Sequence, residues 1–201
     1  MQHIDFLVEE PSAEATLKNL LPKICDVSHS IHSYNGKHDL LRKLSQRLSG
    51  YKKWIPSDYK IVVLIDKDGD DCKRLKKKLD RIAIAAGFVT KSSAQGRNFQ
   101  ILNRLAIEEL EAWFFGDVQA LIKAYPAIPA NLDKKARYRN PDAIRGGTWE
   151  QLEKVLQKAG FFSAGLQKVK AASEISKHMV PERNQSKSFQ VFVSGLKIIT
   201  G

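Results

Sequence analysis

Blocks of apolar residues alternate with helix-like amphipathic patterns over the first half of the chain. The run at 61–65 is continuously apolar and too short for a helix, so it predicts a strand buried on both faces. Apolar stretches at 3–8 and 27–33 predict two earlier strands, and 98–107 predicts a later one, with a short extended segment at 88–90 before it. Between these segments apolar residues recur three and four positions apart, which predicts helices.

Residues with side-chain oxygens mark the starts of the predicted helices. Ser12 is in position to cap the first helix, Asp117 a helix in the second half and Ser188 the last one. Thr148 and Gln151 have the spacing of a capping box at the start of another helix. The second half of the chain is therefore predicted to be mainly helical.

The fold class that these patterns predict is α/β, because strand–helix alternation is typical of a parallel sheet with helices on its faces. We expect a mostly parallel sheet with helices on both faces, followed by a mainly helical C-terminal region. The α/β core is placed at 1–117 and the helical region, packed on the same core, at 118–201.

The chain carries an excess of positive charge. Lys and Arg number 33 against 22 Asp and Glu, which gives a formal net charge of +11. This balance favours an anionic partner such as nucleic acid, although a merely basic protein would show the same total. Cys25 and Cys72 are the only cysteines, which argues against a disulfide framework and a cysteine-rich zinc site. The sequence shows no signal peptide and no apolar run long enough to span a bilayer, so we expect no membrane partner and a cytoplasmic location.

Four carboxylates follow the strand at 61–65 within six positions: Asp66, Asp68, Asp70 and Asp71. Acidic groups crowded at the end of a buried strand repel one another unless a cation neutralises them. Open α/β sheets bind their ligands at this edge. The alternate spacing of Asp66 and Asp68 can direct both carboxylates at one cation, which predicts a divalent-metal site.

Two other interpretations fit part of this cluster. A helix–loop–helix calcium site would need Gly and Glu where the chain has Asp71 and Lys77, and it would not follow a strand, so it is excluded. The second interpretation, in which Asp70 or Asp71 caps a helix and the other carboxylates are solvated, stays open because Asp is common in turns.

Glutamates elsewhere in the chain strengthen the metal interpretation. Glu9 and Glu10 follow the first strand, so in a parallel sheet they would share an edge with Asp66. Mg²⁺ binds few protein oxygens and keeps waters for substrate phosphates, which suits such a sparse set. Glu111 is our candidate for a contribution from a third strand, since the aromatic residues at 113–115 could bury and orient it. Those aromatic residues would fit an ordinary core equally well.

The acidic motifs resemble the Toprim pattern, in which a Glu follows the first strand and an Asp-x-Asp follows a later one. The matching segments are Phe6-Leu7-Val8-Glu9-Glu10-Pro11-Ser12 and Val62-Val63-Leu64-Ile65-Asp66-Lys67-Asp68. The pattern occurs in topoisomerases, bacterial primases and the overcoming-lysogenization-defect (OLD) nucleases. A third segment resembles an uncharacterised Toprim-like family of bacterial proteins, often encoded beside an AAA-type ATPase: Glu109-Leu110-Glu111-Ala112-Trp113-Phe114.

The resemblance covers most of the chain and implies a Toprim-like, Rossmann-like fold. It implies that Glu9 is the Toprim glutamate and that Asp66 and Asp68 are the metal-binding pair for Mg²⁺ or Mn²⁺. Toprim glutamates are usually followed by Gly, where this chain has Glu10.

Basic residues of the second half also resemble family motifs. Lys168 and the segment 183–188 carry this resemblance, so Lys168, Arg183 and Lys187 are expected to contact nucleic acid. Ordinary solvated faces would look the same from the sequence.

Together these features predict a metal-dependent nuclease or a related phosphodiester-processing Toprim protein, with Glu9, Asp66, Asp68 and Glu111 as catalytic residues. The chain has no Gly-rich Walker sequence and should not hydrolyse ATP unaided. The resemblance implies an AAA-type ATPase partner and a role in bacterial defence. Two alternatives stay open: a non-catalytic nucleic-acid-binding or partner-docking module on the same scaffold, and an enzyme acting on small phosphorylated molecules.

Overall fold

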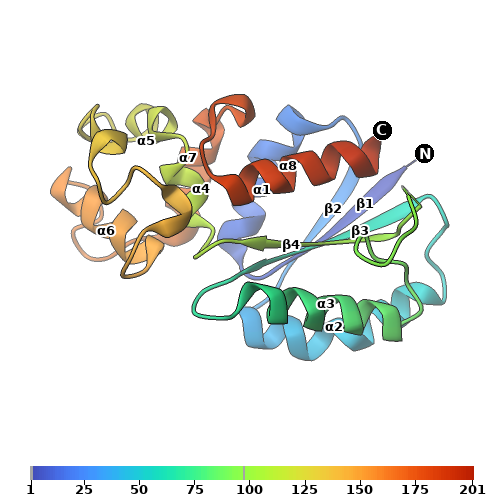
Figure 1. Ribbon diagram of the computed structural model, residues 1–201. Helices are drawn as coiled ribbons and strands as arrows, with labels where there is room; N and C mark the ends of the chain where they lie inside the picture. The colour runs from blue at the N-terminus through green and yellow to red at the C-terminus, as the bar shows by residue number, and fades with distance from the viewer. Residues whose placement is uncertain (1, 97) are drawn as a thin grey trace.

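A four-stranded parallel sheet forms the centre of the protein (Figure 1). The computed structural model describes residues 2–96 and 98–201. Each strand pairs with its neighbours in parallel, and the strand order is β2-β1-β3-β4. The strands are β1 (His3–Val8), β2 (Ser28–Ser33), β3 (Tyr59–Asp66) and β4 (Ile101–Ala106).

Helices cover both faces of the sheet, which confirms the predicted α/β, Rossmann-like fold class (Figure 1). One face is covered by α1 (Pro11–Ile24) and α8 (Lys187–Thr200), and the other by α2 (Lys37–Lys52) and α3 (Cys72–Ala85). Apolar residues alternate between the two faces along β3, so Val62 packs with the first pair of helices and Val63 with the second. This explains why the run at 61–65 is apolar at every position.

Four further helices form a lobe beyond the carboxyl ends of the strands (Figure 1, left). They are α4 (Glu111–Phe115), α5 (Val118–Ala124), α6 (Thr148–Lys158) and α7 (Lys168–His178). Helix α7 contacts α1, and one hydrophobic cluster runs without a break from Ile4 in β1 to Ile199 in α8. Single turns of 3-10 helix lie at Leu132–Lys134, Pro141–Ala143 and Pro181–Arg183. Within the described residues no helix is long and apolar enough to cross a membrane.

Three of the predicted helix caps are wrong, because the hydroxyls expected to cap the helices donate to carboxylates instead. Helix α1 begins at Pro11, and the Ser12 hydroxyl donates to the Glu10 carboxylate instead of capping. Thr148 is the first residue of α6, and its backbone and hydroxyl both donate to Glu109, so no capping box forms.

The last helix is capped two residues earlier than predicted. Ser186, not Ser188, accepts the hydrogen bond from the Phe189 amide, while the Ser188 hydroxyl donates to Asp142. The predicted Asp117 cap is confirmed, since its carboxylate accepts from the Ala120 amide of α5.

The extended segment predicted at 88–90 does not form a strand. Only Thr90 makes a bridge, to Ile101 of β4. The hydroxyls of Thr90 and Ser93 hydrogen-bond to each other, and Ala94 donates to the Thr90 carbonyl, so the chain turns here instead of extending.

The end of α4 is tied to the segment before α8 by buried polar contacts. Asp117 is fully buried and accepts from the Val180 amide at 2.9 Å. The same carboxylate receives two bonds from Arg183, at 2.7 and 2.8 Å. The Asn184 side-chain amide donates to the Trp113 carbonyl at 2.7 Å. These contacts fix the helical lobe against the segment that leads into the start of α8.

Candidate metal centre at the carboxyl edge of the sheet

The point where the strand order reverses lies between β1 and β3. From β1 the chain moves outward to β2, then crosses back to β3 and on to β4. In open α/β sheets, ligands bind outside the carboxyl ends of the strands at such a point. Glu9 follows β1 and Asp66 is the last residue of β3, so both lie at this position. The Glu9 carboxylate accepts a hydrogen bond from the Asp66 backbone amide at 2.9 Å, as the shared-edge argument from the sequence predicts.

Asp66 is a buried carboxylate with several other carboxylates as neighbours, which makes its negative charge unfavourable. It is 9 % exposed, and burial raises its pKa well above the usual value. The neighbouring carboxylates of Glu111, Glu9, Asp68 and Glu10 raise the pKa of Asp66 further. Burial also raises the pKa of Glu9. These carboxylates are therefore stabilised either by binding a proton or by a cation that neutralises their negative charge.

Glu111 brings a second buried carboxylate to this edge, beside Asp66 and the half-buried Glu9. It is 2 % exposed, and its Oε2 atom has no hydrogen-bond partner among the described residues. Burial raises the pKa of Glu111 from its usual 4.5 to about 7. The expectation that a third strand carries this residue is wrong, because the chain leaves β4 at Ala106 and Glu111 opens helix α4. The aromatic residues at 113–115 are all buried in the core.

Lys168 faces these carboxylates from the first turn of α7. Its Nζ atom lies 3.8 Å from Oε1 of Glu10 and 5.0 Å from the centre of the Trp149 ring. Burial lowers the pKa of Lys168, but Glu111, Glu10 and other nearby carboxylates raise it above the usual value. The prediction that Lys168 contacts nucleic acid is not tested by this geometry, which places the ammonium beside the acidic residues.

Asp68 forms an ion pair with Lys37. Its Oδ2 atom lies 2.6 Å from the Lys37 ammonium, which also meets Asp70 at 2.8 Å. Asp68 has a left-handed backbone with a φ of 48°, as does Glu108 with a φ of 61°. Such conformations cost energy in residues other than Gly and gather at functional sites. Lys37 was missed from the sequence, although its place just after the second predicted strand puts it at the same edge.

The remaining acidic residues near this edge have other roles. Glu109 accepts three hydrogen bonds at the start of α6, from the Thr148 amide and hydroxyl and the Trp149 amide, at 2.6 to 2.9 Å. Glu108 lies 3.5 Å from the Lys67 ammonium. Asp71 caps α3 through the Arg74 amide, which confirms the cap interpretation for that residue. Of the acidic stretch 108–111, Glu111 is therefore the residue whose charge acts on Asp66.

The carboxylates fit a hard cation by charge and donor type, although their oxygens are not yet gathered around one point. No three His, Cys, Asp or Glu side chains in the described parts of the chain are arranged as a ready-made metal site. Carboxylate oxygens are nevertheless the ligands that Mg²⁺ and Mn²⁺ prefer. A bound cation would offset the burial and mutual repulsion that raise the pKa values of Asp66 and Glu9, and it would give the Glu111 oxygen a partner. Rotation of Asp68 away from Lys37 would add a fourth carboxylate.

The other two basic residues expected to contact nucleic acid lie away from this edge. Arg183 is bound to the buried Asp117. Lys187 is exposed at the start of α8, with its backbone amide donating to Asp142 and its ammonium 3.3 Å from Gln190. Their contact with nucleic acid remains a prediction.

The raised pKa of Glu111 predicts that the metal-free protein loses stability as the pH rises. The folded protein holds this proton more tightly than the unfolded chain, so stability is highest below about pH 4.5 and falls until about pH 7. The loss from Glu111 amounts to at most about 3 kcal/mol. Urea unfolding at pH 5 and pH 8 in EDTA should therefore show a smaller difference for Glu111→Gln than for the wild type. Glu14→Gln is a control, since Lys18 lowers the pKa of Glu14, and an unchanged slope in Glu111→Gln would contradict the prediction.

The fold and this edge define a doubly wound α/β protein with an acidic cluster at its topological switch point. The chain belongs to the family described as "Domain of unknown function (DUF4276)", whose model matches residues 8–197. Among solved structures it is similar to the C-terminal region of the Burkholderia pseudomallei OLD protein, with 18% sequence identity and a TM-score of 0.49. That match covers 98% of this chain and 96% of the other. The search of curated proteins gave no match.

Proposed function

We propose that this protein is a Mg²⁺- or Mn²⁺-dependent enzyme that hydrolyses phosphodiester bonds in nucleic acid, on a Toprim-type scaffold. The observation that carries the proposal is the unpartnered, buried Glu111 oxygen beside Asp66, at the switch point of the sheet. The net charge of +11 supports an anionic substrate, since the basic residues would attract phosphate toward this edge.

Glu9, Asp66 and Glu111 would hold the metal, joined by Asp68 once it leaves Lys37. A bound metal would supply a water of lowered pKa and stabilise the leaving oxygen of the phosphodiester. We assign these residues as the metal ligands because all of their carboxylates lie at the same edge of the sheet. No cation of the protein fully neutralises any of these carboxylates.

The protein's own cations and acids have separate roles in this proposal. Lys168, held over Trp149, lies at the rim of the acidic cluster and would bind a phosphate oxygen. Glu111, whose pKa burial raises to about 7, would lose its proton on binding the metal and serve as a ligand. Lys37 holds Asp68 while the site is metal-free and would release it on metal binding.

The biological setting is proposed on the Toprim and OLD-nuclease resemblance of the sequence motifs alone. An AAA-type ATPase would supply the nucleotide hydrolysis for which this chain lacks a Walker sequence. The pair would act in bacterial defence against foreign DNA, in the cytoplasm.

The proposal is tested with purified protein and linear, nicked and single-stranded DNA. We expect cleavage in Mg²⁺ or Mn²⁺ and none in EDTA, with activity lost in Glu9→Gln. Cleavage that persists in EDTA, or that Glu9→Gln leaves unchanged, would show that another site or a contaminant is responsible. Absence of cleavage on all three substrates in both metals would contradict the enzyme proposal.

A second candidate function is a non-catalytic nucleic-acid-binding or partner-docking module. The ion pair that Asp68 makes with Lys37 favours it, because that contact keeps one carboxylate out of the cluster. This function predicts binding that needs no metal and weakens steeply with salt, without turnover.

A further inference from the structure

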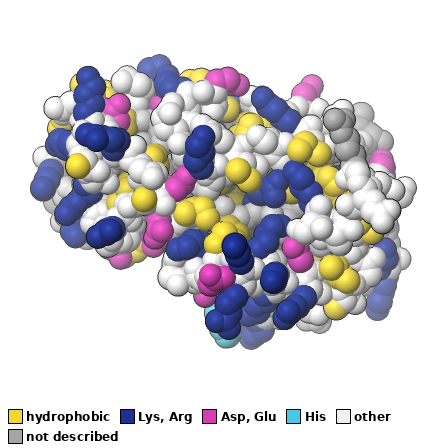
Figure 2. All heavy atoms as spheres, in the orientation of Figure 1, with side chains coloured by type: hydrophobic (Ala, Val, Ile, Leu, Met, Phe, Trp, Pro, Cys, Tyr) yellow, Lys and Arg dark blue, Asp and Glu magenta, His cyan; other side chains and the backbone are white. Residues whose placement is uncertain are grey.

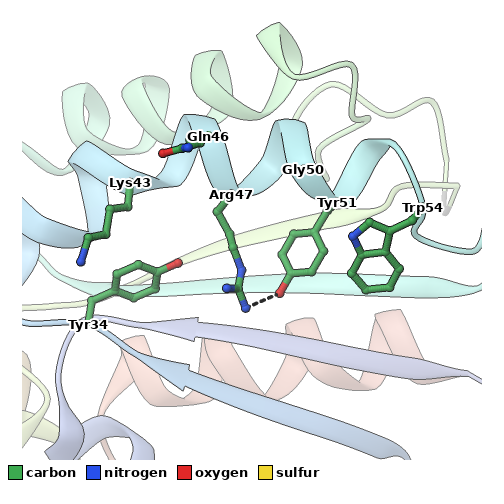
Figure 3. A pocket seen from close by; sticks show the side chains of 7 residues that line it. All are labelled: Tyr34, Lys43, Gln46, Arg47, Gly50, Tyr51 and Trp54. Carbon is green, nitrogen blue, oxygen red and sulfur yellow. Dashed lines mark hydrogen bonds between the residues drawn. The ribbon is translucent and has the colours of Figure 1, made fainter.

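A groove runs along helix α2, on the side that faces the edge strand β2 (Figure 3). It has a volume of about 550 Å³. Figure 3 shows Tyr34, Arg47, Tyr51 and Trp54 pointing into the same space beneath the helix. The lining residues are Tyr34, Lys43, Gln46, Arg47, Gly50, Tyr51 and Trp54.

One aromatic ring of this groove, that of Trp54, is open to solvent to a degree that packing does not explain. Trp54 is 61% exposed, although Trp is usually well buried. Its ring lies 5.5 Å from that of Tyr51, which is buried beneath the helix and fixes one side of the groove. Tyr34 is half-buried at the other end. The groove therefore offers flat apolar surfaces at both ends.

Positive charge lies between these rings. Helix α2 has five basic residues and one acidic residue, Asp39. Asp39 is already bound by Arg42 at 2.7 Å and Lys43 at 2.8 Å. Arg47 lies over the Tyr51 ring at 5.0 Å and donates to the Tyr51 hydroxyl at 3.0 Å. No carboxylate partner of Arg47 appears among the described residues, so its charge remains available to an anion. Figure 2 shows Lys and Arg gathered over the layer where Figure 1 places α2 and α3.

The groove has the length and spacing of a short nucleic-acid strand. Lys43, Arg47 and Tyr51 are four residues apart and form one row on the helix surface. From Lys43 to Lys52, the last residue of α2, the helix rises about 14 Å, which is about four stacked nucleotides at 3.4 Å each. Single-strand sites combine a positively charged groove with rings on which bases stack.

One end of the groove reaches the acidic edge of the sheet. Tyr34 directly follows β2, and its amide donates to the carbonyl of Val8, the last residue of β1. The amide of Gly36 donates to the carbonyl of Glu9. A strand lying along α2 would therefore pass from Trp54 toward the carboxylates.

We propose that the α2 groove binds single-stranded nucleic acid and directs it to the acidic edge. This inference rests on the proposed function, because it names the substrate of that site. The bases stack on Trp54 and Tyr34, and Arg47 binds a phosphate. A duplex is a poor ligand, since its bases are stacked on one another and cannot reach these rings.

Gly50 provides a test that leaves the fold intact. It lies in the last turn of α2, and a side chain added there meets no atom within 4 Å, so it would project into open space. Gly50→Glu and Gly50→Lys both replace a poor helix former with a good one. They have similar size but opposite charge, so one repels a phosphate chain and the other attracts it.

Binding is measured by the anisotropy of a labelled deoxythymidine strand of about 20 nucleotides, longer than common single-strand sites, in EDTA. We expect Trp54→Ala and Gly50→Glu each to weaken binding about tenfold, equivalent to 1.4 kcal/mol, and Gly50→Lys to bind at least as tightly as the wild type. The wild type should bind the strand more tightly than its duplex.

Equal affinity for strand and duplex, or unchanged binding in both Trp54→Ala and Gly50→Glu, would overturn the groove assignment even if metal-dependent cleavage is observed. Conversely, loss of binding in the groove variants with retention in Asp66→Asn would support the groove even if no cleavage were found. The two proposals therefore fail separately.

Discussion

Asp66→Asn is expected to abolish metal-dependent cleavage and at the same time to make the metal-free protein more stable. Asp66 is buried among other carboxylates, so its charge is unfavourable in the folded state. Asn has nearly the same shape and carries no charge, which removes both the repulsion and the cost of burying an ion. The variant lacks a metal ligand, and we expect activity to fall at least about a hundredfold, with a gain on the order of 1 kcal/mol in the free energy of unfolding.

The measurements are cleavage rate in Mg²⁺ and urea unfolding in EDTA at pH 8. Asp71→Asn is the matched control, because Asp71 lies in the same turn and caps α3, a position that Asn fills equally well. The control should change neither quantity. A stable, inactive Asp66→Asn assigns the carboxylate to function. A destabilised variant would instead show that Asp66 supports the fold, and the metal centre would lose its main support.

Asp117→Ala is expected to destabilise the protein by about 3 kcal/mol, because it removes the buried acceptor of two backbone amides and of the Arg183 guanidinium. The Asp117 carboxylate accepts from the amides of Ala120 and Val180 and from two nitrogens of Arg183. Removal of this carboxylate has two effects at once: α5 loses its cap, and the segment before α8 loses its hydrogen bonds to the end of α4. Chemical unfolding measures the loss.

The neighbouring Glu182→Ala serves as control. Glu182 is exposed beside Arg183, so its removal should change stability by no more than about 0.5 kcal/mol. Arg183→Ala should lose stability like Asp117→Ala, because it leaves the buried carboxylate without its cation. If Asp117→Ala is as stable as the wild type, the contacts between α4 and the 180–184 segment do not hold the helical lobe in place.

The sheet and the pairing of its acidic residues follow from local sequence patterns. An apolar run flanked by turns predicts β3, and parallel strands end at one edge, so the approach of Glu9 to Asp66 was predictable without coordinates. The ion pair of Lys37 with Asp68 was not predictable, because the periodicity of apolar residues does not show where a flexible lysine side chain points.

Contacts between segments that are distant in sequence account for the remaining differences between the predictions and the structure. Glu109 binds the first residue of α6, which lies 39 positions further along the sequence. Arg183 pairs with Asp117 although 66 positions separate them. Sequence patterns of helix caps and charges are local, so they do not show hydrogen-bond or ion-pair partners that are distant in sequence. Glu111 was correctly placed near the acidic cluster, but a helix carries it, because the chain turns sharply between β4 and α4.

Helix α8 has a consequence for how the protein is made. Phe189, Phe192 and Leu196 are fully buried against the sheet layer, and the Val191 carbonyl accepts a hydrogen bond from Arg104 of β4. Until 187–200 leaves the ribosomal tunnel, this side of β4 and the ring of Trp113 lack their cover. The nascent chain can form helices early, but this part of its native core closes only after 187–200 has emerged, and chaperones that shield apolar surface would matter most before that point.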